Sequence, residues 1–126
     1  MAKILIVDDC EDISSLLEVL LKSEHHDVSI SKNGRCAQEN LKSSDYDLVI
    51  TDVLMPDMDG FELSKFIREE LPEPKNKTPI IAMSGGGTML PSKVALAGIG
   101  LHANVLLKKP FSANEMKDAV SNILAA

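Results

Sequence analysis

The sequence has few aromatic residues and few cysteines, and it has no long apolar run. Aromatic residues make up 3% of the 126 residues and tryptophan is absent, so the core must be aliphatic. The two cysteines, Cys10 and Cys36, are not spaced as metal ligands, and we expect two reduced thiols packed in the fold. The apolar run before Asp8 is far shorter than a signal peptide or a membrane span. These absences favour a globular protein of the cytoplasm.

Positive charge is also scarce. The chain has 13 basic and 19 acidic residues, which give a formal net charge of −6. A surface that binds nucleic acid needs a basic stripe, and an anionic membrane also attracts basic segments. The charge therefore argues against nucleic acid and membranes as partners. With 44% hydrophobic residues, a chain of this length can bury the core of one domain.

Strand-like and helix-like segments alternate along the whole chain. The pattern of apolar residues predicts strands at 3–7, 28–31, 47–51, 79–83 and 104–107. It predicts helices at 13–21, 35–43, 59–71, 91–98 and 112–124. Five β–α units with short connections favour a parallel sheet that has helices on both faces.

Several residues mark the expected helix faces and helix ends. The first helix is expected to bury one apolar face, which comprises Ile13, Leu16, Leu17, Leu20 and Leu21. Asp59 and Ser112 are each followed three residues later by glutamate, the pattern of a capping box. Asp9 is also placed where it could cap the first helix.

Polar residues follow the apolar strands at the points where these strands end. Asp8 and Asp9 follow the first strand, and Asp52 follows the third. Ser84 follows the fourth strand, and Lys109 follows the fifth. Because the carboxyl ends of parallel strands meet at one edge of the sheet, these side chains should form one site. Three carboxylates, a hydroxyl and an ammonium group suit a magnesium ion and a phosphoryl group.

These residues resemble the receiver domain of two-component response regulators. Met55-Pro56 and Gly60 in the loop after the third strand, and Pro110-Phe111 after Lys109, extend the resemblance. It covers essentially the whole chain and implies a flavodoxin-like, doubly wound α/β fold. The parallel sheet should have five strands in the order 2-1-3-4-5. Residues 1–126 would form one receiver domain with no output domain.

The resemblance also implies a role for each residue of the acidic site. Asp52 matches the aspartate that accepts the phosphoryl group and forms an acyl phosphate. Mg²⁺ is the implied cofactor, and its implied ligands are Asp8, Asp9, Asp52 and the backbone carbonyl of Leu54. A direct metal bond is expected from one of the paired acids, and a water-mediated contact from the other.

The basic and hydroxyl residues have implied roles as well. Lys109, rather than Lys108, matches the family lysine because it directly precedes a proline, and the bond to Pro110 is expected to be cis. It would pair with Asp52 at rest and with phosphoryl oxygens afterwards. Ser84 matches the hydroxyl that turns toward the phosphoryl group. The sequence departs from the family at Leu106, where many receivers have a tyrosine or phenylalanine.

The implied function is that of a single-domain response regulator. It would accept a phosphoryl group from a sensor histidine kinase or a histidine phosphotransfer protein, signal to a downstream protein and lose the group by self-catalysed hydrolysis. Otherwise it would not be an enzyme. The kinase is expected on the first helix and the loop after the fifth strand. Outputs are expected on the fourth helix, the fifth strand and the last helix.

Two other functions compete with this interpretation. One is an enzyme of another class, but an aspartyl-phosphate phosphatase would need an aspartate where Leu54 stands. A nucleotide-binding enzyme would need a glycine-rich loop after the first strand, and residues 8–11 contain no glycine. The other is a phosphorylation-independent, receiver-like binding module. All five chemical positions are filled, which argues against it, but the absence of an aromatic residue at Leu106 keeps it open.

Overall fold

The computed structural model describes residues 2–53, 55, 58–84 and 102–125. The helix expected at 91–98 lies outside these residues. The elements are β1 Lys3–Val7, α1 Glu11–Ser23, β2 Asp27–Ser31, α2 Gly34–Ser43, β3 Leu48–Asp52, α3 Gly60–Glu70, the 3₁₀ helix η1 Lys75–Lys77, β4 Ile80–Ser84, β5 Val105–Lys108 and α5 Ala113–Ala125. Within the described residues, no helix has the length and apolar character to cross a membrane.

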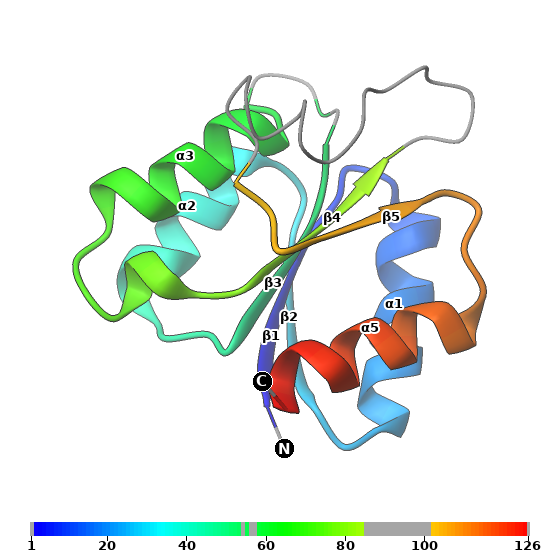
Figure 1. The fold of residues 1–126 in the computed structure, drawn as a ribbon. Helices are drawn as coiled ribbons and strands as arrows, with labels where there is room; N and C mark the ends of the chain where they lie inside the picture. The colour runs from blue at the N-terminus through cyan, green and yellow to red at the C-terminus, as the bar shows by residue number, and fades with distance from the viewer. Residues whose placement is uncertain (1, 54, 56–57, 85–101, 126) are drawn as a thin grey trace.

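The five strands form one parallel sheet in the order β2-β1-β3-β4-β5 (Figure 1). This order confirms the prediction from the sequence. β2 pairs with β1 on one side, and β3 pairs with β1 on the other side, so the direction in which strands are added reverses after β2. The carboxyl ends of β1 and β3 are therefore neighbours at the point where the direction of building reverses. Ligands bind at such a point in open α/β sheets.

Among the described residues, α1 and α5 cover one face of the sheet, and α2 and α3 cover the other (Figure 1). The side chains of each strand alternate between these faces. In β1, Ile4 and Ile6 pack toward α1 and α5, whereas Leu5 and Val7 pack toward α2 and α3. All four are fully buried. A strand that is apolar on both faces is what a sheet covered by helices on both sides requires.

The helix caps agree in part with the sequence. The Asp59 carboxylate accepts a hydrogen bond from the backbone N–H of Glu62 at 3.0 Å, so Asp59 caps α3 as predicted. Ser112 and Glu115 form the reciprocal bonds of a capping box at the start of α5. The suggestion that Asp9 caps α1 was wrong, because the N-cap residue is Cys10.

Two expectations about buried side chains were also wrong. Leu16 does not belong to the buried face of α1, because 62% of its surface is exposed. The helix turns so that Leu17 and Leu21 enter the core, and Ser14 takes the remaining buried position. Cys10 and Cys36 are free thiols as expected, but both are exposed rather than packed.

The amino end of the sheet is held by a half-buried arginine. The Arg68 guanidinium of α3 donates hydrogen bonds to the carbonyls of Asn76, Thr78 and His102 at 3.1, 2.7 and 3.4 Å. It also donates to Oδ1 of Asn104 at 3.1 Å. Burial lowers the pKa of Arg68 from its usual value. One cation thus joins α3, the turn before β4 and the segment that leads into β5.

Candidate functional site

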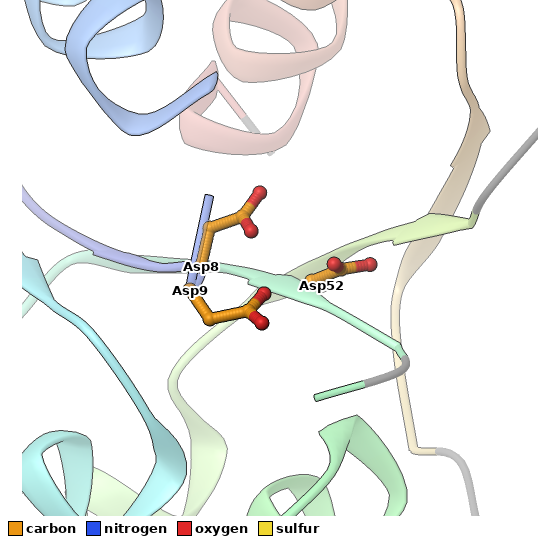
Figure 2. A group of neighbouring side chains, drawn as sticks. All are labelled: Asp8, Asp9 and Asp52. Carbon is orange, nitrogen blue, oxygen red and sulfur yellow. The ribbon is translucent and has the colours of Figure 1, made fainter. Parts of the chain in front are cut away.

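Three carboxylates meet at the carboxyl end of the sheet, on the side chains of Asp8, Asp9 and Asp52. One oxygen from each residue can be chosen so that all three oxygens lie within 4.8 Å of one another. Figure 2 shows the three side chains together at the ends of β1 and β3. Oxygen atoms at this spacing suit a hard divalent cation such as Mg²⁺.

Strand register explains why these residues meet. Val7 of β1 pairs with Thr51 of β3, so the next residues along the two strands are Asp8 and Asp52. Both are buried: 2% of the surface of Asp8 and 9% of the surface of Asp52 are exposed. Asp9 is exposed. The site therefore has two carboxylates in its floor and a third at its rim.

Backbone hydrogen bonds hold Asp8 in place. Its backbone N–H donates to the carbonyl of Ser31 at 3.2 Å, which continues the pairing with β2 past the end of the strand. Its Oδ1 accepts from the backbone N–H of Cys10 at 3.0 Å. The bond to Cys10 fixes the turn between β1 and α1, so the start of the helix and the floor of the site are positioned together.

Lys109 is the basic residue of the site. Its Nζ lies 3.4 Å from Oδ2 of Asp8 and 3.4 Å from Oδ2 of Asp52. Lys108 is exposed. The choice of Lys109 over Lys108 therefore agrees with the geometry. The bond to Pro110 is cis, as expected. Three carboxylates and one ammonium group leave a surplus of negative charge, which a divalent cation would balance.

The carboxyl group of Asp52 is electrostatically perturbed. Burial raises its pKa above the usual value, Lys109 opposes that change, and the negative charge of Asp8 adds to it. Desolvation therefore outweighs the ion pair with the lysine. A carboxylate that is incompletely stabilised by the protein gains more from a bound cation than a fully paired carboxylate does.

Ser84 is the last residue of β4 and is buried, with 2% of its surface exposed. It lies one residue beyond Met83, the register partner of Asp52, so it is at the same edge of the sheet. Its carbonyl accepts from the backbone N–H of Lys109 at 2.7 Å. The fold thus brings Ser84, Lys109 and the three aspartates to one edge. The carbonyl of Leu54 lies outside the described residues.

The sequence predicted a kinase contact on the first helix and the loop after the fifth strand, but it did not predict the apolar groove that these elements form beside the site. The groove has a volume of about 360 Å³, and it is lined by Ile13, Leu16, Lys109, Pro110 and Phe111. It joins the exposed face of α1 to the loop after β5. One feature of the sequence indicated exposed apolar surface on α1. Val19 does not fall at the helical spacing of the other apolar residues of this helix. Val19 is in fact 69% exposed.

The model of the family described as the response regulator receiver domain matches residues 4–121. The chain belongs to this family. Receiver domains are the phosphoacceptor domains of two-component response regulators, and they bind Mg²⁺ at an acidic site. In this receiver domain Asp8, Asp9 and Asp52 form the acidic cluster.

The transcriptional regulatory protein CpxR of Escherichia coli (strain K12) is 34% identical over 124 residues. The match covers 98% of this receiver domain and 50% of CpxR. The response regulator ArlR of Staphylococcus saprophyticus is 31% identical over 116 residues, which cover 92% of this chain and 49% of ArlR. The receiver domain therefore spans about half the length of the curated relatives it matches.

A solved structure of the chemotaxis protein CheY4 of Vibrio cholerae superimposes with a TM-score of 0.84 at 31% identity. It covers 98% of both chains. Its similarity supports the flavodoxin-like assignment of the fold, in agreement with the strand order.

Proposed function

We propose that this receiver domain accepts a phosphoryl group on Asp52 from a phosphohistidine of a sensor kinase or a phosphotransfer protein. The observation that carries the proposal is the placement of the Asp52 carboxylate, which lies beside two further carboxylates and 3.4 Å from the ammonium group of Lys109. This set provides a nucleophile together with groups that can manage the charge of a transferred phosphoryl group.

The transfer forms one bond and breaks one. An oxygen of Asp52 attacks phosphorus, the P–N bond of the phosphohistidine breaks, and the histidine leaves after protonation. Mg²⁺, when it is held by Asp8, Asp9 and Asp52, lowers the repulsion between the carboxylates and the anionic donor. The carbonyl of Leu54 is its further expected ligand. Water then attacks the acyl phosphate, and the products are inorganic phosphate and the free Asp52 carboxylate.

Lys109 contacts Asp52 before and after the transfer, and Ser84 contacts it after the transfer. Before transfer, the ammonium group of Lys109 is shared between Asp8 and Asp52. After transfer, it pairs with the phosphoryl oxygens, and the hydroxyl of Ser84 turns toward the same oxygens. These two movements change the positions of the ends of β4 and β5. The new surface binds a downstream protein, so phosphorylation becomes a signal.

The apolar groove beside the site supports the proposal that the phosphodonor docks there. Its residues Leu16 and Phe111 come from α1 and the loop after β5, and Lys109 belongs to both the groove and the site. Val19 extends the exposed apolar surface by one helical turn. An amphipathic helix that carries the phosphohistidine would bury its apolar face here. Leu16 and Phe111 would then anchor the donor while its imidazole reaches Asp52.

Two further expectations from the sequence stay predictions. They are that the domain works without an output domain and that it is cytoplasmic. Leu106 is half-buried and packs near Val53 and Ala82, so it can repack when the site changes, although it has no ring to rotate. A phosphorylation-independent binding module would share this leucine, and the labelling experiment separates the two functions.

The test is the intact mass of the protein after incubation with Mg²⁺ and acetyl phosphate. We expect one added phosphoryl group, which is absent when Mg²⁺ is removed and absent in Asp52→Asn. An adduct that persists in Asp52→Asn would contradict the assignment of the acceptor. If no adduct forms, amide spectra with beryllofluoride decide the question. A Mg²⁺-dependent change at Asp52 shows fast hydrolysis, and unchanged spectra favour the binding module.

A further inference from the structure

Two glycines lie against described residues at the two ends of the connection between β3 and α3. Both are buried at the first position of a helix, Gly34 in α2 and Gly60 in α3. Neither has a φ angle in the left-handed region, so neither is needed for its backbone conformation. Their common property is that other atoms occupy the space of a β-carbon.

At Gly60 the space of a β-carbon is occupied by backbone atoms of Asp52 and Val53. A β-carbon there would lie 2.7 Å from the carbonyl oxygen of Asp52 and 2.9 Å from Cα of Val53. The backbone N–H of Gly60 donates to the carbonyl of Val53 at 2.8 Å, which closes the loop. The start of α3 thus rests directly on the backbone that carries the Asp52 carboxylate.

At Gly34 the space of a β-carbon is occupied by atoms of Met58, which lies two residues before Gly60. A β-carbon on Gly34 would lie 2.6 Å from both Cβ and Cγ of Met58 and 2.8 Å from its carbonyl oxygen. Met58 is half-buried and packs against the core under α2 and α3. Since a backbone oxygen is among the close atoms, rotation of the Met58 side chain would not relieve the contact.

The start of α2 is a fixed surface for this contact. The Asn33 side chain accepts from the backbone N–H of Cys36 at 2.8 Å and caps the helix. The Asn40 side chain donates to Oγ of Ser31 at 2.7 Å and ties the helix to β2. Ala37 is fully buried. With α2 held in this way, the loop that carries Met58 would have to yield to a larger residue at position 34.

We infer that Gly34 is a positioning residue for the Mg²⁺ site, which acts through Met58 and Gly60 on Asp52. A side chain at position 34 would push Met58 outward, and the displacement would pass through Gly60 to the backbone of Asp52. The carboxylate of Asp52 would then move relative to Asp8 and Asp9, which follow β1 rather than β3 and stay in place. The inference rests on the proposed role of the site, but the property that it concerns is metal binding.

The experiment measures the dissociation constant of Mg²⁺ by titration of ¹⁵N-labelled protein with magnesium chloride, followed by amide NMR shifts. In Gly34→Ala we expect the dissociation constant to rise about tenfold, the lower end of the effect of altered support behind metal ligands. Met58→Ala removes Cγ, one of the three Met58 atoms next to position 34, without crowding α2, and we expect its dissociation constant to rise too.

A matched control separates positioning from loss of helix stability. Glu39 is an exposed residue of α2, and Glu39→Gly weakens the helix by about 1 kcal/mol without touching the loop. It should bind Mg²⁺ as the wild type does. If Gly34→Ala does not fold, Met58→Ala provides the test. A wild-type dissociation constant in the folded variants would overturn the inference. A wild type that binds Mg²⁺ but accepts no phosphoryl group would overturn only the proposed function.

Discussion

The two ends of the sheet each contain a charged group removed at least partly from solvent, but the two groups differ in how many partners they have. At the amino end, the Arg68 guanidinium donates to four oxygen atoms within hydrogen-bond distance. At the carboxyl end, two buried carboxylates share the ammonium group of Lys109, and a third carboxylate lies at the rim. A charge with several hydrogen-bond partners fixes a structure. A charge with too few partners keeps part of its binding capacity for a ligand.

The largest effect is expected from removing the Arg68 guanidinium at the amino end of the sheet. Arg68→Ala leaves the carbonyls of Asn76 and Thr78 without this donor, and we expect the free energy of unfolding to fall by about 3 kcal/mol. Urea unfolding measures this loss. The affinity for Mg²⁺ should not change, because the altered residue is at the opposite end of the sheet. A large loss of Mg²⁺ binding in the folded variant would show that the two ends are coupled.

The next effect is expected from removing the ammonium group that pairs with Asp8 and Asp52 at the carboxyl end. Lys109→Gln should slow phosphorylation by acetyl phosphate about 100-fold, the effect of losing one charged donor to a transferring group. Its affinity for Mg²⁺ should rise, because the lysine no longer competes for Asp8 and Asp52. The time course of the intact mass with acetyl phosphate and a Mg²⁺ titration measure the two changes. Lys108→Gln makes the same charge change at an exposed neighbour and should alter neither quantity.

A smaller effect is expected at the rim of the site. Asp9 is exposed, so Asp9→Asn should change the free energy of unfolding by no more than about 0.5 kcal/mol. It should still weaken Mg²⁺ binding about tenfold, because one charged oxygen of the cluster is lost. Thermal unfolding and calorimetric titration give the two values. Equal Mg²⁺ affinity in Asp9→Asn and the wild type would remove Asp9 from the metal site.

The smallest expected effect is a gain in the stability of the folded protein when the charge of Asp52 is removed. Because burial raises the pKa of Asp52, the folded protein holds its proton more tightly than the unfolded chain does. The stability that this group contributes is present below its unfolded pKa and is lost as pH rises through its folded pKa. Without Mg²⁺, Asp52→Asn should therefore melt at a higher temperature than the wild type at neutral pH. The difference should shrink toward acidic pH, and a difference independent of pH would contradict this explanation.

The sequence was most informative about the carboxyl end of the sheet. Short apolar strands that end in aspartate, serine or lysine can be recognised from neighbouring residues alone, and parallel topology then brings Asp8, Asp52 and Lys109 together. The order of the strands came from the resemblance to a family. Local patterns also located the caps of α3 and α5, because a capping box spans only four residues.

The amino end was not predicted, because its contacts join distant parts of the chain. Arg68 and Asn104 are 36 residues apart in the sequence, and no local pattern marks an arginine that will be buried among carbonyls. The exposure of Leu16 was missed for a related reason. An apolar residue at helical spacing indicates the core only when another element covers it, and here the loop after β5 leaves a groove.

The two exposed thiols have a practical consequence. The chain has no tryptophan and a single tyrosine, so its own fluorescence would report little about the site. Cys10 is at the N-cap of α1, next to Asp9, and Cys36 is in the first turn of α2, two residues after Gly34. A spin label on each would place one label beside Asp9 and the other near Gly34 without any added cysteine. The distance between the labels could then be followed as Mg²⁺ and a phosphodonor are added.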